Sequence, residues 1–196
     1  RYPVSFNGKE RIVTVSGEAY FEVASMMDGA TSSKVPFIVE IASDAGKIAG
    51  RVEVLGTHFN VNSYSDEDNI KTTLVEGKVR VVAAYSDQPA ELSPGEQAVM
   101  SRPQQGKSQE LYKVKAKVDQ VIAWKDGVFD FQDASLREVM RQLARWYDLE
   151  VVYENDPEMY FVGKMSRKMR LPNLLKALDK SGVKFRLEDN RKLIVQ

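Results

Sequence analysis

The sequence predicts a mainly β N-terminal domain followed by a small α+β domain, with the division near residue 120. Before that point apolar side chains recur at every second position, which is the period of a half-buried β-strand. After it they recur at three- and four-residue intervals, as on one face of an amphipathic helix. We therefore expect residues 1–118 to form an antiparallel sandwich, a roll or a β-helical sheet, and residues 121–196 to form an α+β domain.

The first strands are predicted from alternation alone. The run "RIVTVSGEAYFEV" (residues 11–23) predicts one half-buried strand with five side chains on its apolar face, namely Val13, Val15, Ala19, Phe21 and Val23. Before it, Asn7-Gly8 is a strong hairpin-turn signal, so the domain is expected to open with a hairpin. The run "SMMDGATSSK" (residues 25–34) predicts an exposed loop, and "VPFIVEIAS" (residues 35–43) predicts the next strand.

The middle of the β region contains a change of phase. The apolar residues Val52 and Val54 are even-numbered, whereas the later ones, Leu55, Phe59 and Val61, are odd-numbered, which predicts a β-bulge at or near Gly56. Further on, "IKTTLVEGKVRVV" (residues 70–82) predicts a hairpin that turns at Glu76-Gly77. A turn is also predicted at Ser93-Pro94-Gly95, and a strand in the alternating run "LYKVKAKV".

Two similar units are predicted in residues 121–196. The first helix is expected to have Asp133 as its N-cap and an apolar face made of Leu136, Val139, Met140, Leu143 and Tyr147. The same spacing recurs 35 residues later at Leu171, Leu174, Leu175 and Leu178. Strand-like runs follow each helix ("LEVVYE" and "VKFRLE"), and "NRKLIVQ" closes the chain, so we expect two helix-strand pseudo-repeats.

Composition excludes several classes of function. The chain has no net charge: residues 1–120 carry 14 basic and 16 acidic side chains, and residues 121–196 carry 14 and 12, so we expect no nucleic-acid partner. The sequence has no cysteine, which excludes disulfides, thiolate catalysis and cysteine-ligated zinc. It begins at Arg1 without a signal-type segment and has no apolar run long enough for a membrane helix, so we expect a fragment of a longer protein.

The single histidine, His58, is interpreted as structural. A catalytic triad, a histidine base or a zinc site needs partners that a chain with one histidine and no cysteine does not supply. Strand phase places its side chain opposite Phe59 and Val61, towards solvent or a polar neighbour. The acidic run at residues 65–69 lacks the ligand spacing of a calcium loop, and no phosphate-binding or nucleophile motif occurs. We therefore expect no enzyme activity, no metal and no cofactor.

One basic run is a candidate partner-binding site. It consists of Lys164, Arg167, Lys168 and Arg170, between the two predicted helices. Such a run can recognise an acidic partner, and the alternative is an ordinary solvated loop. Three aromatic residues allow a similar choice between an interface and the small domain's core, namely Trp124, Trp146 and Tyr147.

The chain resembles the periplasmic region of FecR-family anti-sigma factors, in the form common in Bacteroidetes. The resemblance rests on "GEAYFEVA", "VLGTHFNVNSY", "TTLVEGKVRV" and "LSPGEQAVM" in the β region, and on "AWKDGVFDFQDASLREVMRQLARWYDLEVVY" and "FVGKMS" beyond it. The C-terminal domain is similar to the short signalling domains of secretins and TonB-dependent transporters. The family pattern requires Leu55, Gly56, Phe59 and Val61 within "VLGTHFNV" but not His58.

This resemblance implies a non-enzymatic relay. The parent protein would be a single-pass inner-membrane protein whose cytoplasmic segment, absent from this chain, binds an extracytoplasmic-function (ECF) sigma factor. Its periplasmic part would receive a signal from the N-terminal signalling domain of a TonB-dependent outer-membrane transporter. The family's β domain usually begins with earlier strands, so we expect their absence to leave an open sheet edge and a tendency of the fragment to form a homodimer.

Two alternatives remain open. A carbohydrate-binding or carbohydrate-active β domain would use exposed aromatic side chains, for which the candidates are Tyr64, Tyr85 and Tyr112. A structural subunit of a secretion or pilus machine would use the same small α+β domain, although the β-region signatures are foreign to such machines.

Overall fold

The computed structural model describes residues 3, 6, 9–29, 33–43, 46–86, 88–104, 107–189 and 191–196. Contacts divide the chain into two compact units, Arg1–Ile122 and Ala123–Gln196. The predicted hairpin turn at Asn7-Gly8 lies outside the described residues.

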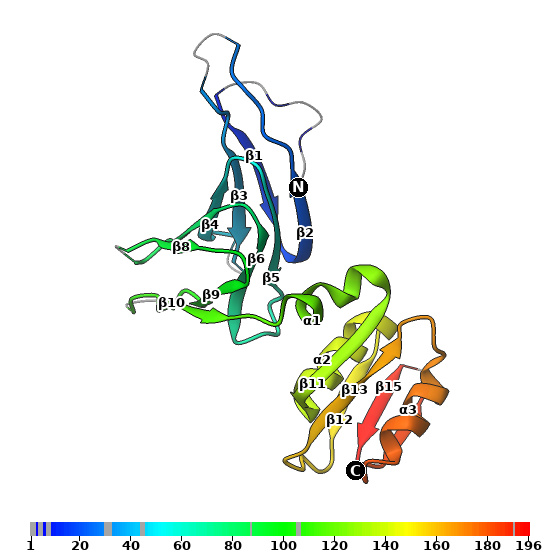
Figure 1. The fold of residues 1–196 in the computed structure, drawn as a ribbon. Helices are drawn as coiled ribbons and strands as arrows, with labels where there is room; N and C mark the ends of the chain where they lie inside the picture. The colour runs from blue at the N-terminus through cyan, green and yellow to red at the C-terminus, as the bar shows by residue number, and fades with distance from the viewer. Residues whose placement is uncertain are drawn as a thin grey trace. The chain divides into compact units, whose positions relative to one another are not determined.

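The N-terminal unit is a β-sandwich of two five-stranded sheets (Figure 1). In sheet order, the first contains β1 (Arg11–Val15), β3 (Phe37–Ala42), β4 (Ile48–Val54), β7 (Val79–Ala83) and β8 (Ala90–Leu92). The second contains β10 (Leu111–Lys115), β9 (Glu96–Ser101), β6 (Asn69–Glu76), β5 (Thr57–Ser63) and β2 (Gly17–Val23), and the short helix α1 (Val118–Ile122) follows β10. All described strand pairs in this unit are antiparallel except β1 with β3.

One core fills the space between these sheets. It is made of the inward-facing aliphatic and aromatic side chains of both sheets, including Val39, Ile41, Val52, Phe59, Val61 and Leu74. Phe59 stacks on Phe21, with ring centroids 5.0 Å apart. The mainly β class expected from alternation is confirmed.

The single strand predicted over residues 11–23 is wrong. The chain ends β1 at Val15, turns at Gly17 with a φ of 84°, and enters the opposite sheet as β2. Val13 in β1 and Val23 in β2 nevertheless face the same core. Alternation reports which side of a strand is buried, and that side is the same before and after the chain changes sheets.

The same exchange of sheets explains two further errors. β4 and β5 belong to different sheets, so the phase change near Gly56 comes from a crossover, and the register shift in this region lies between His58 and Phe59. Leu55 is exposed in the crossover and does not share a face with Phe59. Glu76-Gly77 also joins strands of different sheets, β6 and β7, and therefore does not form the predicted hairpin.

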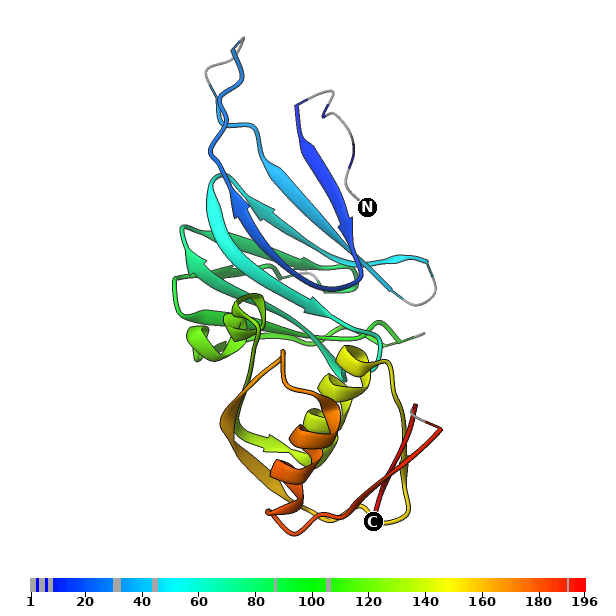
Figure 2. The same cartoon turned by 90° about the vertical axis from the view of Figure 1, so that its right-hand side faces the viewer.

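The C-terminal unit has two small sheets and two helices (Figure 2). β11 (Val128–Ser135) pairs with β13 (Tyr160–Ser166), and the other sheet has the order β12 (Glu150–Tyr153), β15 (Lys192–Val195), β14 (Phe185–Glu188). The helices are α2 (Leu136–Tyr147) and α3 (Leu171–Asp179), and the 3-10 helix η1 (Ala123–Asp126) precedes β11. The predicted helix and strand of each repeat are present, and each helix also follows a strand, β11 or β13, that was not predicted.

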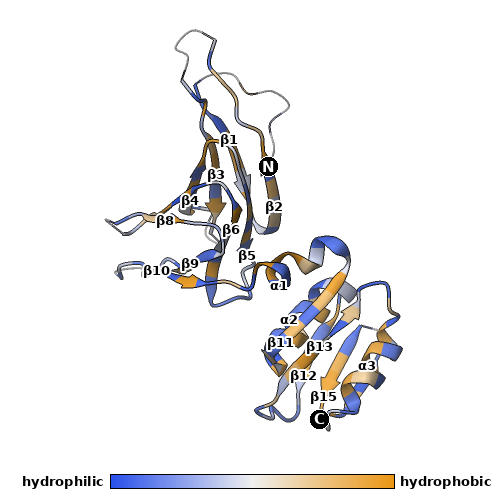
Figure 3. Ribbon diagram, in the orientation of Figure 1, coloured by the Kyte–Doolittle hydropathy of each residue, from blue (hydrophilic) through white to orange (hydrophobic). Residues whose placement is uncertain are grey.

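A second core belongs to this unit. Its fully buried members come from both sheets and both helices, among them Phe129, Phe131, Val139, Leu143, Leu174 and Leu193. β15 is hydrophobic over most of its length (Figure 3), and Leu193 and Val195 face this core. The helical faces predicted from sequence are the buried faces of α2 and α3.

The predicted N-cap of α2 is wrong by two residues. Ser135 is the N-cap, and it forms a capping box with Glu138: the Ser135 hydroxyl accepts from the Glu138 N–H at 3.3 Å, and the Ser135 N–H donates to the Glu138 carboxylate at 2.8 Å. Asp133 has a φ of 64° and lies where the register of β11 against β13 shifts, between Gln132 and Ala134.

Candidate partner-binding site

The four residues of the predicted basic run lie on β13, on the turn after it and at the start of α3. They do not form a single solvated loop. The structure gives them three different environments, and these decide which positive charges are available to a partner.

Lys164 forms an ion pair across the small sheet. It lies directly opposite Asp130 of β11, and its Nζ is 2.9 Å from the Asp130 Oδ2. The Asp130 side chain is 1% exposed, whereas that of Lys164 is 66% exposed. Gln132 also donates to the same carboxylate, at 3.3 Å. Because a buried carboxylate requires a compensating charge, Lys164 stabilises β11 and β13 and offers little free charge to a partner.

Arg167 is part of an aromatic stack. Its guanidinium carbon lies 4.5 Å from the ring centroid of Phe129 and 5.1 Å from that of Trp146. Its Nε donates to the Val128 carbonyl at 3.3 Å, and its own carbonyl accepts from the Trp146 indole N–H at 2.9 Å. Trp146 packs edge-on against Phe129 and is half exposed, so it caps the core from outside. These contacts fix the turn that carries the next two basic residues.

Lys168 and Arg170 are the available charges. Both are exposed, and among the residues that the structure describes neither side chain has a hydrogen-bond or ion-pair partner. Arg170 is the N-cap of α3, makes no capping hydrogen bond with its side chain, and is followed by a first turn without an acidic residue. The positive end of the helix dipole adds to these two charges. An acidic group is the complementary ligand for this surface.

Tyr147 holds the turn between β13 and α3 by a hydrogen bond. Its hydroxyl donates to the Met169 carbonyl at 2.6 Å, and burial raises the pKa of this phenol above its usual value. Two of the aromatic residues proposed for an interface or the core can be placed. Tyr147 packs against the C-terminal core, and Trp146 lies half exposed beside Arg167. The roles of Asp130 and of the stack on Arg167 were missed from sequence, because both depend on residues that are far apart along the chain.

The other candidates from the sequence are dispersed. His58 lies on β5 opposite Glu76 of β6, with 3.2 Å between its Nδ1 and the Glu76 Oε2, which is the polar neighbour expected for it. Tyr85 and Tyr112 are half exposed, whereas the ring of Tyr64 lies within 3.1 Å of the position that a Cβ on Gly17 would take. Within the described residues, no group of three or more His, Cys, Asp or Glu side chains is placed to hold a metal ion.

Comparison with known proteins adds a family to this geometry. Residues 128–195, which span β11 to β15, match the family model described as FecR, C-terminal. A candidate anti-sigma factor from Parabacteroides distasonis, solved at 1.65 Å, is 28% identical, with a TM-score of 0.78 over 100% of this chain and 84% of its own. The C-terminal unit is therefore similar to the C-terminal domain of FecR. A second crystal structure described in the same words, solved at 2.50 Å, matches 99% of this chain and 83% of its own length, with 28% identity and a TM-score of 0.76.

None of the curated proteins matches this chain. The family match and the two similar crystal structures support a FecR-like regulatory role. Among the described residues, no helix has the length and apolar character that a membrane-spanning segment needs.

Proposed function

We propose that this chain is the periplasmic sensor and relay part of a single-pass, inner-membrane anti-sigma factor of the FecR family. It would receive a signal from the N-terminal signalling domain of a TonB-dependent outer-membrane transporter. It would pass that signal to an ECF sigma factor through a cytoplasmic segment outside this chain. The support is the family match over residues 128–195, the similarity to the two crystal structures, and a C-terminal unit that presents uncompensated positive charge.

The observation that carries the proposal is the difference between the fixed and the free basic residues. Lys164 and Arg167 are committed to Asp130 and to the Phe129 and Trp146 rings, so they build the surface. Lys168 and Arg170 project from it without partners among the described residues. A surface of this kind recognises an acidic partner and accelerates its encounter, with a strong dependence on salt.

Isothermal titration with the purified signalling domain of the transporter encoded beside this gene tests the proposal. The wild-type chain should bind, and Lys168→Glu/Arg170→Glu should weaken binding by about tenfold or more, because reversed charges at an interface repel an acidic partner. A matched control is Lys176→Glu/Lys180→Glu, which makes the same change of charge at exposed positions of α3 and the residue after it.

The two possible failures have different meanings. Absence of binding by the wild-type chain to its cognate transporter domain would refute the proposed function. Wild-type binding that both double variants weaken equally would keep the function and remove Lys168 and Arg170 as its site.

A further inference from the structure

Strand β13 has a free edge and an unusually apolar outer face. Among the described strands it pairs with β11 alone, and the sheet contains no third strand. On its outer face Val162 is 82% exposed and Tyr160 is 56% exposed. Gly163, the residue after Val162, has open space where a Cβ would lie. The backbone of β13 is therefore accessible around Val162.

The hydrogen-bonding groups on this edge can be assigned from the two ends of the strand. The Leu136 N–H donates to the Met159 carbonyl at 2.9 Å, and the Arg167 N–H donates to the Gly127 carbonyl at 2.8 Å. Main-chain groups alternate in direction along a strand, so the odd-numbered residues of β13 point to β11. The even-numbered residues point outward, and these are Tyr160, Val162, Lys164 and Ser166.

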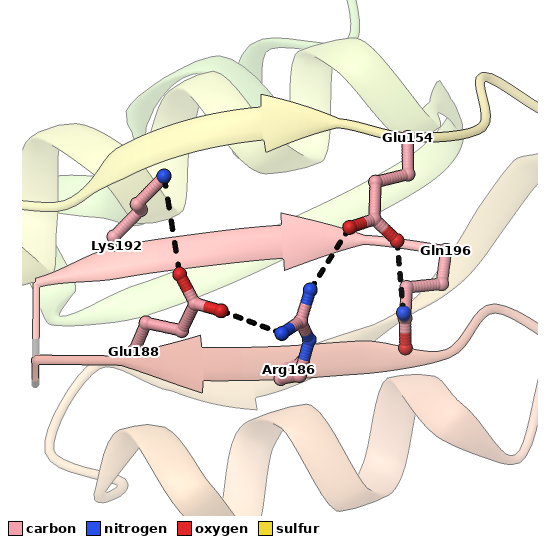
Figure 4. Close-up of polar contacts among 5 residues, drawn as sticks. All are labelled: Glu154, Arg186, Glu188, Lys192 and Gln196. Atoms are coloured by element: carbon pink, nitrogen blue, oxygen red, sulfur yellow. Dashed lines mark hydrogen bonds and ion pairs between the residues drawn. The ribbon is translucent and has the colours of Figure 1, made fainter.

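Edge strand β14 of this unit carries two charged side chains, Arg186 and Glu188, whereas β13 carries one. In the three-stranded sheet, Arg186 of edge strand β14 bonds to Glu188 at 2.6 Å and to Glu154 at 2.9 Å, and Lys192 approaches Glu188 at 3.9 Å (Figure 4). Charged side chains on an edge strand discourage pairing with another chain. The only charge within β13 is Lys164, which is neutralised by Asp130.

The two ends of β13 carry opposite charges, so two copies of the strand have complementary charges when they run antiparallel. The exposed acid Glu158 precedes the strand and the exposed base Lys168 follows it. Neither side chain has a partner among the described residues. When a strand with unlike ends pairs with its own copy in the antiparallel sense, each acidic end lies beside a basic end. The same pairing places the apolar centre of one strand against the apolar centre of the other.

We infer that β13 is a homodimerisation edge, which joins two copies of this chain through an antiparallel β13–β13 ladder. In the register that covers the most apolar surface, Val162 faces Val162 of the second copy. Tyr160 then faces Lys164 of the second copy, and Glu158 is the diagonal neighbour of its Lys168. A ladder of this length joins two small sheets into one of four strands. It buries little surface, so the dimer is expected to be weak and reversible.

This edge differs from the one that the sequence suggested. The expected open edge concerned the N-terminal strands of the sandwich, whereas β13 belongs to the C-terminal unit and is defined by its own contacts. The inference does not depend on the proposed transporter partner, because its occupant is a second copy of the chain.

Sedimentation equilibrium of the full chain, from micromolar to millimolar concentration, tests the dimer. The wild type should associate, and Val162→Lys should raise the dissociation constant by about tenfold or more, because it places like charges face to face on the axis. Val162→Thr is the matched control: it keeps the β-branched shape and introduces no charge, so it should associate nearly as well as the wild type.

A charge exchange tests the orientation of the strands. Glu158→Lys and Lys168→Glu should each weaken association, because each places like charges beside one another. The double variant Glu158→Lys/Lys168→Glu restores unlike ends and should recover most of the lost affinity. A double variant weaker than both single variants would refute the antiparallel pairing.

Amide hydrogen exchange locates the interface independently of any variant. Raising the concentration should protect the N–H groups of Val162, Lys164 and Ser166, while the odd-numbered amides of β13 stay protected at every concentration. The inference is overturned if the chain is monomeric at millimolar concentration. It is also overturned if a dimer forms and the new protection lies in residues 11–23.

Discussion

At the scale of single residues, Gly77 shows how closely the sandwich constrains its crossovers. It has a φ of 93°, and a Cβ at this position would lie 2.8 Å from the Gly56 carbonyl oxygen. Gly77→Ala should therefore destabilise the N-terminal unit by about 2–4 kcal/mol, through backbone strain and the clash together. Gly95→Ala is a matched control: its φ is 85°, but the space around its Cβ is open.

Urea denaturation of both glycine variants measures the difference. Gly95→Ala should lose only about 1 kcal/mol, which is the cost of the positive φ. Equal losses in the two variants would show that the contact with the Gly56 carbonyl has no energetic effect.

Two partly buried phenols predict the response to alkaline pH. Burial raises the pKa of Tyr147 and of Tyr153, so the folded state favours the neutral phenols. Their contribution to stability is complete below the unfolded pKa of about 10, and it is lost as the pH rises through the raised folded values. Denaturation across this range should show a falling stability, and the fall should be smaller in Tyr147→Phe/Tyr153→Phe. An unchanged fall in the double variant would assign it to other groups.

Residue roles were predictable where one side chain determines them. The turn glycine at position 95 follows from residue type, and the polar neighbour of His58 follows from strand phase. Lys164 and Arg167 were identified as basic, but their environments were not. Asp130 and Lys164 are 34 positions apart and meet only because β11 and β13 pair. No local pattern in the sequence encodes that register.

At the scale of elements, α2 is defined by its capping box. Ser135→Ala should destabilise the C-terminal unit by about 1 kcal/mol, because the first turn loses its side-chain acceptor and the Glu138 carboxylate loses the hydroxyl. Ser135→Thr keeps both the acceptor and the hydroxyl donor at the N-cap, and it is the control that should retain most of the stability. Thermal denaturation followed by circular dichroism measures both. An equal loss in the two variants would mean that the cap contributes nothing.

Helices were predicted more accurately than strand partners. The buried faces of α2 and α3 follow from the 3.6-residue period, which needs no knowledge of the rest of the fold. The N-cap was misplaced because Asp133 and Ser135 are both good N-cap residues, and the choice depends on where β11 ends. Strand alternation identified the buried face of each strand but not the sheet to which the strand belongs. Alternation alone therefore places the strands on either side of Gly17, and those on either side of Gly77, in one sheet. The chain crosses between the sheets at both glycines.

At the scale of the whole molecule, the two units have separate cores. The sandwich core takes its described residues from positions up to Leu111, and the second core begins at Phe129, with no member in common. The proposed relay requires that a partner can act on one unit while the other stays folded. Separate cores allow that, because each can lose its packing without exposing the other.

Matched core substitutions should reveal this independence. Leu143 and Val61 are both fully buried, one in each unit. Leu143→Ala should cost about 3 kcal/mol and lower only the transition of the C-terminal unit, whereas Val61→Ala should cost about 2 kcal/mol and lower only that of the sandwich. Tryptophan fluorescence reports the C-terminal unit, because Trp124 and Trp146 both lie in it, while circular dichroism reports both units. If either substitution shifts both transitions equally, the units unfold as one cooperative body, and a relay would have to work through a rigid molecule.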